Sequence, residues 1–366
     1  MHHLKKLTLA LAAVALCTNA QAIELINDGD TTVNLGGFVK AEGVFTSADD
    51  DVPENNVSDF EGDVRESRIN LEAKTVVDDR NLKAFIETDF YGGDIANDQA
   101  ELRLRHAFIQ VDDVTFGKTW NGQFFAVAPL LTEQLDFWGV AVGTVAGSGL
   151  NVRPDLTVHY AKNGFRVTAQ EPVNDDADLP DLVASYTANT SDFGYANAPD
   201  LDFIVGVMGR DVNKSVEDDS DSKIGIGGSL ATRLNLAENR WGKGSLHASV
   251  YTGDGMGVYS GLCASGPLNP AVEQGCDAEN GDLVSQTGFS VGYRQVFSPK
   301  LRANLRYGEV NVDNEDDTTL DVKSVNLIYT YLPGLDFGVE WRDRSRTTLP
   351  WRLGGQEVEV MARYKF

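Results

Sequence analysis

The last ten residues, Glu357–Phe366 (EVEVMARYKF), alternate between two kinds of side chain with a period of two. One face of an extended strand carries Val358, Val360, Ala362, Tyr364 and Phe366, and the other carries Glu357, Glu359, Met361, Arg363 and Lys365. Successive side chains of a β-strand point to opposite faces. This stretch therefore predicts a strand with one apolar face and one charged face.

The same alternation recurs along the chain in stretches bounded by turn residues, and helical periodicity is nearly absent after residue 22. It predicts sixteen strands, near 31–46, 66–77, 81–91, 101–111, 114–120, 153–161, 164–171, 181–189, 201–211, 223–236, 243–253, 285–297, 299–311, 319–332, 334–346 and 352–366. Beyond the N-terminus, no apolar run reaches the ~18 residues of a transmembrane helix. Sixteen alternating strands are typical of an all-β transmembrane barrel.

The connectors between these strands are long and short in turn, with Asn189–Asp200 as the exception. The long ones include Ser47–Val64, Gly92–Ala100, Trp120–Val152 and Asp254–Val284, and the short ones include Asp78–Arg80, Asp112–Asp113, Lys162–Gly164 and Ser298–Pro299. Outer-membrane barrels have short periplasmic turns and long extracellular loops. The pattern predicts an antiparallel barrel in the outer membrane with both termini periplasmic. A soluble sandwich or propeller is disfavoured, because no blade repeat is present and one sandwich core could not bury sixteen apolar faces.

The N-terminus indicates export. Met1–Ala22 has Lys5 and Lys6, a short apolar stretch and a small-x-small ending, which predicts a signal peptide followed by a single barrel domain, 23–366. The 366 residues hold 31 Lys+Arg against 55 Asp+Glu, and loss of Lys5 and Lys6 leaves a charge of −26. This balance argues against a nucleic-acid partner, because phosphate binding relies on clustered basic residues. Cys263 and Cys276, the two cysteines left after cleavage, predict a disulfide.

Two stretches resemble known proteins. The ending Tyr364-Lys365-Phe366 resembles the signal that Gram-negative outer-membrane proteins present to their assembly machinery. The series from Gly37-Phe38-Val39-Lys40 through LRLRHA (102–107) to FGKTW (116–120) resembles the DcaP-like branch of the porins. This resemblance implies a trimeric channel linked to uptake of dicarboxylic and aromatic acids, with the third extracellular loop folded into the lumen.

The positions out of phase with the apolar set are expected to face the lumen, and basic residues outnumber acidic ones there by about two to one. The basic ones include Lys40, Arg68, Lys74, Lys83, Arg103, Arg105, Arg153, Arg166, Arg210, Arg233, Arg294, Arg302, Arg306, Arg342, Arg344, Arg363 and Lys365. Acidic runs fall instead in connectors, around Asp49–Asp51, Asp175–Asp181, Glu217–Asp221 and Glu315–Asp317. These runs predict solvated loops, with Ca²⁺ binding or lipopolysaccharide bridging as the alternative.

The third loop, Trp120–Val152, is apolar enough to be expected against the barrel wall rather than in water. If it folds inward, Glu133 and Asp136 are presented across the pore from Lys118, Arg68, Arg103, Arg105 and Arg153. Arginine suits carboxylates through its fixed fork of donors, and low-dielectric walls focus the field of such charges. We therefore expect a diffusion channel with a preference for small anionic (di)carboxylates. A general porin with weak or cation selectivity is the alternative.

Two other function classes are weaker. A barrel enzyme would need a histidine beside a nucleophile, and His106, His159 and His247 fall on separate strands, with His106 in the apolar phase. An adhesin would give no stable current steps. We expect no enzyme activity, cofactor or metal. Small outward residues on the first strand predict a homotrimer, with outer-membrane lipid and lipopolysaccharide as surroundings.

Overall fold

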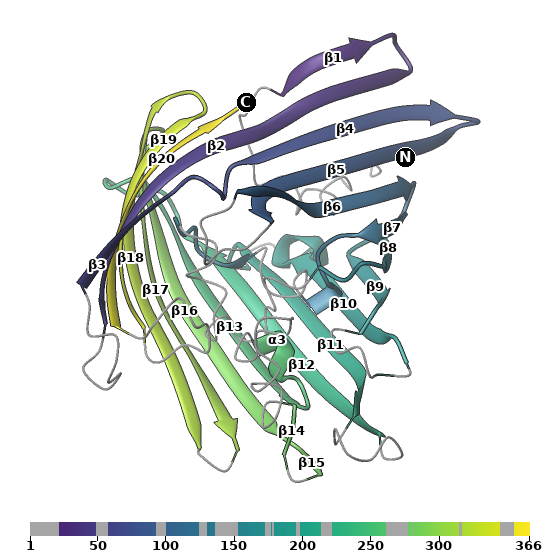
Figure 1. The fold of residues 1–366 in the computed structure, drawn as a ribbon, viewed down its shortest axis with the longest axis vertical. Helices are drawn as coiled ribbons and strands as arrows, with labels where there is room; N and C mark the ends of the chain where they lie inside the picture. Colours follow the sequence, from purple (N-terminus) through teal and green to yellow (C-terminus); the bar gives the residue numbers. More distant parts are fainter. Residues whose placement is uncertain are drawn as a thin grey trace.

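The protein forms a ring of antiparallel strands that closes on itself (Figure 1). The computed structural model describes residues 22–48, 58–92, 100–123, 130–135, 153–172, 177, 179–194, 198–213, 222–260, 277–279, 281–314, 317–344 and 355–366. Eighteen strands share one sheet, and sixteen of them make the ring, which β2 and β20 close by pairing from Phe38↔Lys365 to Ala48↔Gly355.

The sixteen ring strands follow chain order around the barrel. They are β2 (Thr31–Ala48), β4 (Arg68–Val77), β5 (Arg80–Gly92), β6 (Glu101–Val111), β7 (Val114–Lys118), β8 (Thr157–Lys162), β9 (Phe165–Gln170), β10 (Asp181–Asn189), β11 (Leu201–Asn213), β12 (Ser222–Asn235), β13 (Lys243–Asp254), β16 (Ser285–Ser298), β17 (Leu301–Asp313), β18 (Thr318–Leu332), β19 (Leu335–Arg344) and β20 (Gly355–Lys365). Each corresponds to one strand expected from the alternation, so the sixteen-stranded barrel is confirmed.

Four strands of the structure were not expected from the sequence. β1 (Ile23–Asn27) pairs with the start of β2. β3 (Ser58–Asp63) pairs with the end of β2, inside the stretch Ser47–Val64 that was expected to be a loop. β14 (Ala278–Glu279) and β15 (Asp282–Leu283) form a small separate hairpin. β3 was missed because its sequence, SDFEGD, is too polar for apolar alternation, and pairing with β2 holds it extended.

The ring has an apolar outside and a polar inside. On β20, Val358, Val360 and Tyr364 are 38%, 45% and 51% exposed, whereas Glu357 and Glu359 are 3% and 0% exposed. Soluble proteins show the opposite arrangement, because ions are costly to bury without partners. A closed barrel with an apolar outer band and a polar interior is the form in which β-strands cross a membrane. Among the described residues, no helix is long and apolar enough to span a membrane.

Two of the places where the alternation breaks involve predicted site residues. The pairing of β5 with β6 shifts register between Glu87↔His106 and Thr88↔Leu104, which leaves Arg105 as an extra residue. A β-bulge of this kind turns two successive side chains to one face, so Arg105 and His106 are both buried. The expectation that His106 faces outward is therefore wrong.

The second break, at Gly117 in β7, lets Lys118 face the lumen although Phe116, two residues before it, faces outward. Gly117 has a φ of +122°, and a Cβ there would overlap the carbonyl oxygen of Ala107. Glycine adopts this backbone conformation without steric cost. Phe116 is 46% exposed, on the outside, whereas Lys118 bonds inward to the Arg153 carbonyl at 2.9 Å.

Candidate functional site: the charged barrel interior

One arc of the inner wall, from β4 to the start of β8, gathers five of the predicted site residues. Arg68, Arg103, Arg105, Lys118 and Arg153 all lie there, and we call this set the basic arc. β4 supplies Arg68, β6 supplies Arg103 and Arg105, β7 ends at Lys118, and Arg153 follows the long loop just before β8. The bulge in β6 and the bend at Gly117 bring these groups to the same face.

Most of the basic arc is neutralised by carboxylates on neighbouring strands. The Asp89 carboxylate, 0% exposed, accepts from Arg103 Nη2 and from Arg105 Nη1, each at 2.6 Å. Glu87 accepts from Arg105 Nε at 3.1 Å and lies 3.9 Å from Arg68 Nη1. Lys118 binds Asp155. Charge-assisted pairs of this kind hold the side chains in place but leave little net charge.

Arg153 differs from the other members of the arc. Its guanidinium stacks over the Trp120 ring, 4.7 Å from the centroid, and no carboxylate of the described residues forms an ion pair with it. Burial, followed by the like charges of Arg105, Arg103 and Arg68, lowers the pKa of Arg153 well below its usual value. A bound anion would stabilise the charged form of this guanidinium, because its negative charge offsets both the cost of burial and the repulsion from the neighbouring arginines.

The described middle of the third loop, Leu130–Leu135, contacts inward-facing side chains on the other side of the ring. Leu130 packs with Ile204 of β11 and Ala231 of β12, and its carbonyl oxygen lies 2.6 Å from His247 Nδ1 of β13. Further along, Thr132 lies against Gly292 of β16. The apolar residues 124–129 and 136–139, including Asp136, lie outside the described residues.

Glu133 binds the wall of β16, β17 and β20. Arg302 donates to its two carboxylate oxygens from Nε and Nη2, each at 2.7 Å, and Arg294 and Arg363 lie 3.5 and 3.6 Å away. Burial raises the pKa of Glu133. The Arg302 hydrogen bond and the three guanidinium charges lower it by more than burial raises it, so the pKa of Glu133 is below its usual value. Its carboxylate is thus turned toward Arg302, on the side of the ring away from the basic arc.

Leu135 is held through both its side chain and its backbone. The side chain packs with Ile328 and Met361, and a Cβ on Gly338 would lie 2.6 Å from Leu135 Cδ2. The Leu135 N–H donates to Glu340 at 3.1 Å, and Lys40 Nζ donates to the Leu135 carbonyl at 3.0 Å. Sequence reasoning missed Gly338, Glu340 and Lys40 as loop contacts, although glycines in the inward phase of a strand are a readable signal of close approach.

The three histidines each have structural partners. His106 contacts the Thr119 hydroxyl at 3.2 Å, and His159 contacts the Thr168 hydroxyl at 2.6 Å. His247 lies between Ser245 Oγ, at 2.8 Å, and the Leu130 carbonyl. The partner of His247 on the side away from the serine is a neutral carbonyl, not the carboxylate of a catalytic triad, so its visible role is to hold Leu130.

Most of the remaining predicted groups lie outside the described residues. Cys263 and Cys276 fall in 261–276, which the structure does not describe, so their disulfide stays a prediction, and most of the acidic runs are likewise undescribed. Asp181 is an exception, because it begins β10 and is buried rather than in a solvated loop. Within the described ranges, no cluster of His, Cys, Asp and Glu is arranged to hold a metal ion.

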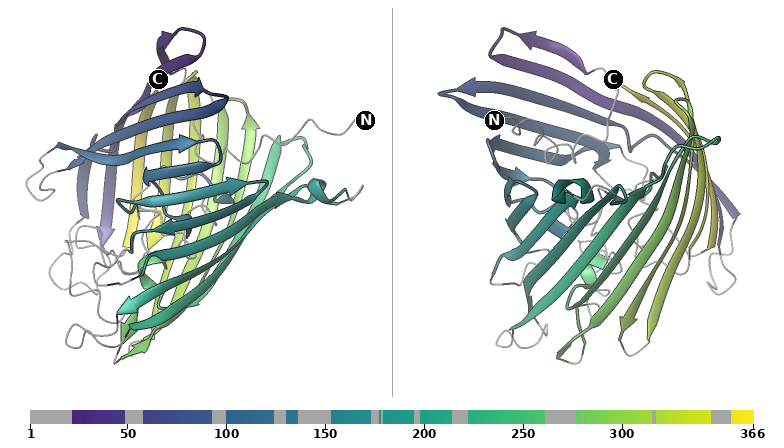
Figure 2. Two further views of the ribbon diagram at one scale, coloured as in Figure 1. Left: turned by 90° about the vertical axis from the view of Figure 1, so that its right-hand side faces the viewer. Right: turned by 180° about the vertical axis from the view of Figure 1, so that it is seen from behind.

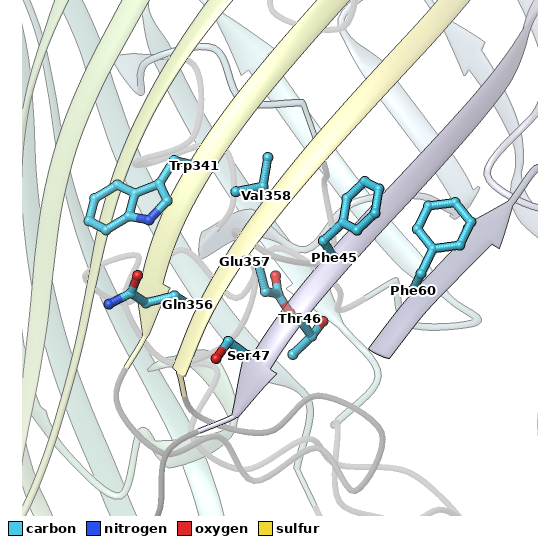
Figure 3. Close-up of a pocket in the computed structure, with 8 residues that line it drawn as sticks. All are labelled: Phe45, Thr46, Ser47, Phe60, Trp341, Gln356, Glu357 and Val358. Atoms are coloured by element: carbon cyan, nitrogen blue, oxygen red, sulfur yellow. The ribbon is translucent and has the colours of Figure 1, made fainter. Parts of the chain in front are cut away.

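The C-terminal aromatic residues lie at the end of the ring where the turns are short. Tyr364 is exposed on the outside, and Phe366 exchanges backbone hydrogen bonds with Gly37 at 3.1 Å. A groove of about 360 Å³ lies at the other end of the same seam, lined by Phe45, Phe60, Trp341 and Val358 (Figure 3). Phe45, Phe60 and Val358 are exposed on the outer face and Trp341 is half-buried beside them, so the groove is not part of the interior.

Comparisons with known proteins show which solved structures share this fold. No protein-family model matches the sequence, and no curated protein matches it. The outer membrane channel DcaP of Acinetobacter baumannii superposes with a TM-score of 0.71 at 22% identity, covering 93% of this chain and 99% of that one. The anion-selective porin from Comamonas acidovorans superposes at 0.63 with 11% identity, covering 92% and 100%. The trimer form of OmpT from Vibrio cholerae superposes at 0.58 with 14% identity, covering 92% and 100%.

These three structures share the closed barrel over almost their whole length, and the DcaP channel was the kind of protein that the sequence resembled. The identities are low, so the likeness concerns the fold. The apolar outer band and the alternating long and short connectors agree with a multi-pass barrel of the outer membrane. The chain therefore has the fold of the sixteen-stranded porin channels, as its DcaP-like sequence motifs predicted.

Proposed function

We propose that the protein is an outer-membrane porin, a water-filled channel for passive diffusion of small hydrophilic solutes. The observation that carries this proposal is the closed ring whose inner wall is lined by charged residues while its outer wall is apolar. A barrel of sixteen strands is wide enough to leave an aqueous lumen. The loop segment Leu130–Leu135 along one side of that lumen supports a narrowed passage bounded on the other side by the basic arc.

The finer proposal is a weak preference for anions, clearer for carboxylates than for chloride. The basic arc holds five cationic side chains, and four carboxylates contact it: Glu66, Glu87, Asp89 and Asp155. The surplus is small, and Arg153 is the member without a carboxylate partner among the described residues. We assign Arg153 the main contact with a passing carboxylate, supported by Arg68 beside it.

Reversal potential across a KCl gradient in planar bilayers tests both levels of the proposal. Wild type should give stable current steps and a potential of the sign that anion preference requires. Arg153→Gln should abolish that preference, whereas Arg240→Gln, a guanidinium stacked on Trp241 in a short turn, should leave it unchanged. Absence of current steps would overturn the porin proposal. A preference for potassium in wild type would leave a general or cation-selective porin, which the acidic connectors would favour.

We also propose a homotrimer. Exposed aromatic side chains mark the outer face from β9 round to β20, among them Phe165, Trp241, Tyr331, Phe337 and Tyr364. Between β2 and β6 the exposed residues towards the short-turn end are aliphatic instead, such as Leu71, Val77, Ile86 and Ile109. Aromatic belts sit at lipid–water interfaces, so an arc without one suits contact with protein.

Native mass spectrometry after gentle detergent extraction tests the trimer. Three chains are expected in wild type. Ala73→Trp, on the aliphatic arc, should shift the population to single chains, while Val207→Trp, on the exposed outer face of β11, should not. A wild-type mass of one chain would overturn this proposal without affecting the channel itself.

A further inference from the structure

A second connector also lies against the inner wall. After β13, residues Gly255–Ser260 turn inward and include the short helix α3 (Gly257–Ser260), which Figures 1 and 2 show within the ring of strands. Met256 and Tyr259 are both 0% exposed. They pack with Val183, Met208 and Tyr251, which are inward-facing residues of β10, β11 and β13. Apolar side chains are unfavourable on the wall of an aqueous lumen unless they are removed from water, and this loop segment covers them.

The wall under this segment is shaped to receive it. A Cβ on Gly227 of β12 would lie 3.1 Å from Met256 Cγ, and one on Gly253 of β13 would lie 2.9 Å from the same atom. A Cβ on Gly225 would lie 2.7 Å from the carbonyl oxygen of Asp254. Glycine in a strand interior costs stability and commonly marks the close approach of another backbone or group. Three glycines here leave the space that Met256 and its neighbours occupy.

Arg210 of β11 holds the two ends of the connector together. Its Nη1 donates to Asp277 Oδ2 at 2.8 Å and to the Gly255 carbonyl at 3.3 Å, and its guanidinium lies over the Tyr259 ring at 5.4 Å. The Tyr259 hydroxyl in turn bonds to Asp181 and accepts from Gln170 Nε2 at 2.8 Å. Arg210 and Asp181 are buried, so removal of one partner would leave a charge that is costly to keep in place.

We propose that Gly255–Ser260 and Asp277 form a second pore-narrowing element, separate from the third loop, and that Arg210 is the residue that positions it. This inference rests on the proposed porin function. It also assigns Arg210 a role different from the anion-attracting one expected from its lumen phase, because its charge is taken up by Asp277 and Asp181. Release of the element would widen the lumen on the β9–β13 side, across from the β2, β19 and β20 wall.

Substituting Arg210 and Asp277 one at a time tests the proposal, because a merely structural contact would not change conductance and anion preference in the way expected here. Asp277→Asn and Arg210→Gln should both raise single-channel conductance, by about 1.5-fold or more, because both release the element. Asp277→Asn keeps the cation and should also raise anion preference, whereas Arg210→Gln should lower it or leave it unchanged. Arg80→Gln, which breaks the Arg80–Asp112 pair in a short turn, is the control and should leave conductance unchanged.

Adjacent glycines of β12 provide a test that changes no charge. Gly227→Val fills the space of Met256 and should raise conductance as Asp277→Asn does. Gly228 is on the outer face, and a Cβ there would lie 3.7 Å from its nearest neighbour, the Gly206 carbonyl oxygen. Gly228→Val should therefore behave as wild type. Folding of each variant is checked by heat-dependent mobility in detergent gels. If wild type conducts and both variants, Gly227→Val and Asp277→Asn, fold but keep the wild-type conductance, the proposal of a second pore-narrowing element is overturned. A non-conducting wild type would overturn the porin proposal instead.

Discussion

Arg302 and Glu133 are 169 residues apart in the chain and meet through two parallel hydrogen bonds of 2.7 Å. Arg302 lies near the start of β17, so this pair fixes the middle of the third loop to the wall opposite the basic arc. Paired N–H···O bonds between a guanidinium and a carboxylate restrict orientation as well as distance. The pair therefore sets where the loop can lie.

Removal of the Glu133 charge should loosen the third loop. In Glu133→Gln the bidentate pair is lost, and a contact of about 1.5–3 kcal/mol goes with it. We expect noisier single-channel currents and a lower voltage for channel closure in planar bilayers. Glu309→Gln, which changes a half-buried carboxylate bonded to the Tyr307 hydroxyl, is the control. Identical noise and closure voltage in Glu133→Gln and wild type would contradict a fixing role for the pair.

The same pair predicts how the channel responds to acid. Burial raises the pKa of Glu133, but its guanidinium partners lower it by more, so that it lies below its usual value. A carboxylate with a depressed folded pKa contributes stability that is present above its unfolded pKa and lost as pH falls through the folded pKa. Closure voltage should thus stay constant down to about pH 4.5 and fall only below it.

Glu133→Gln should abolish this acid response. A wild-type transition between pH 5 and 7 would show that another group controls the loop.

The space beside Leu135 can be filled without changing a charge. In Gly338→Val the new side chain would collide with Leu135, whose Cδ2 would lie 2.6 Å from a Cβ, and overpacking typically costs about 1–3 kcal/mol. We expect a lower melting temperature in detergent and a changed conductance. Gly209→Val, where nothing lies within 4 Å of a Cβ, should show neither change. Equal melting curves for the two variants would mean that Leu135 is not docked at Gly338.

Asp89 should limit the anion preference. Asp89→Asn removes a buried charge from between Arg103 and Arg105, so the chloride-to-potassium permeability ratio should rise while stability falls, because two guanidinium groups lose their partner. Asp112→Asn, in a short turn where Asp112 binds Arg80 at 2.8 Å, should leave the ratio unchanged. A ratio that falls in Asp89→Asn would contradict the assignment of Asp89 to the permeation path.

The barrel could be predicted from the sequence alone. Alternation is a local property, since each strand places its own side chains on two faces, and a membrane on one side and water on the other force those faces to differ. The phase that puts Val358 outside and Glu359 inside could therefore be predicted without knowing any neighbour. Turn residues such as Asp112, with a φ of +49°, marked the short connectors for the same local reason.

Which charges remain available in the lumen could not be predicted in this way, because it depends on contacts between strands. Arg105 is neutralised by Glu87 and Asp89 of the neighbouring strand, while Arg153 stacks on Trp120, and the sequence gives these arginines the same phase and the same expected role. The places where Leu135 and Met256 dock were likewise hidden, because they depend on inward glycines of β19 and β12. Strand phase is set within a few residues, but ion pairing and loop docking join residues far apart in the chain, so they exist only once the ring has closed.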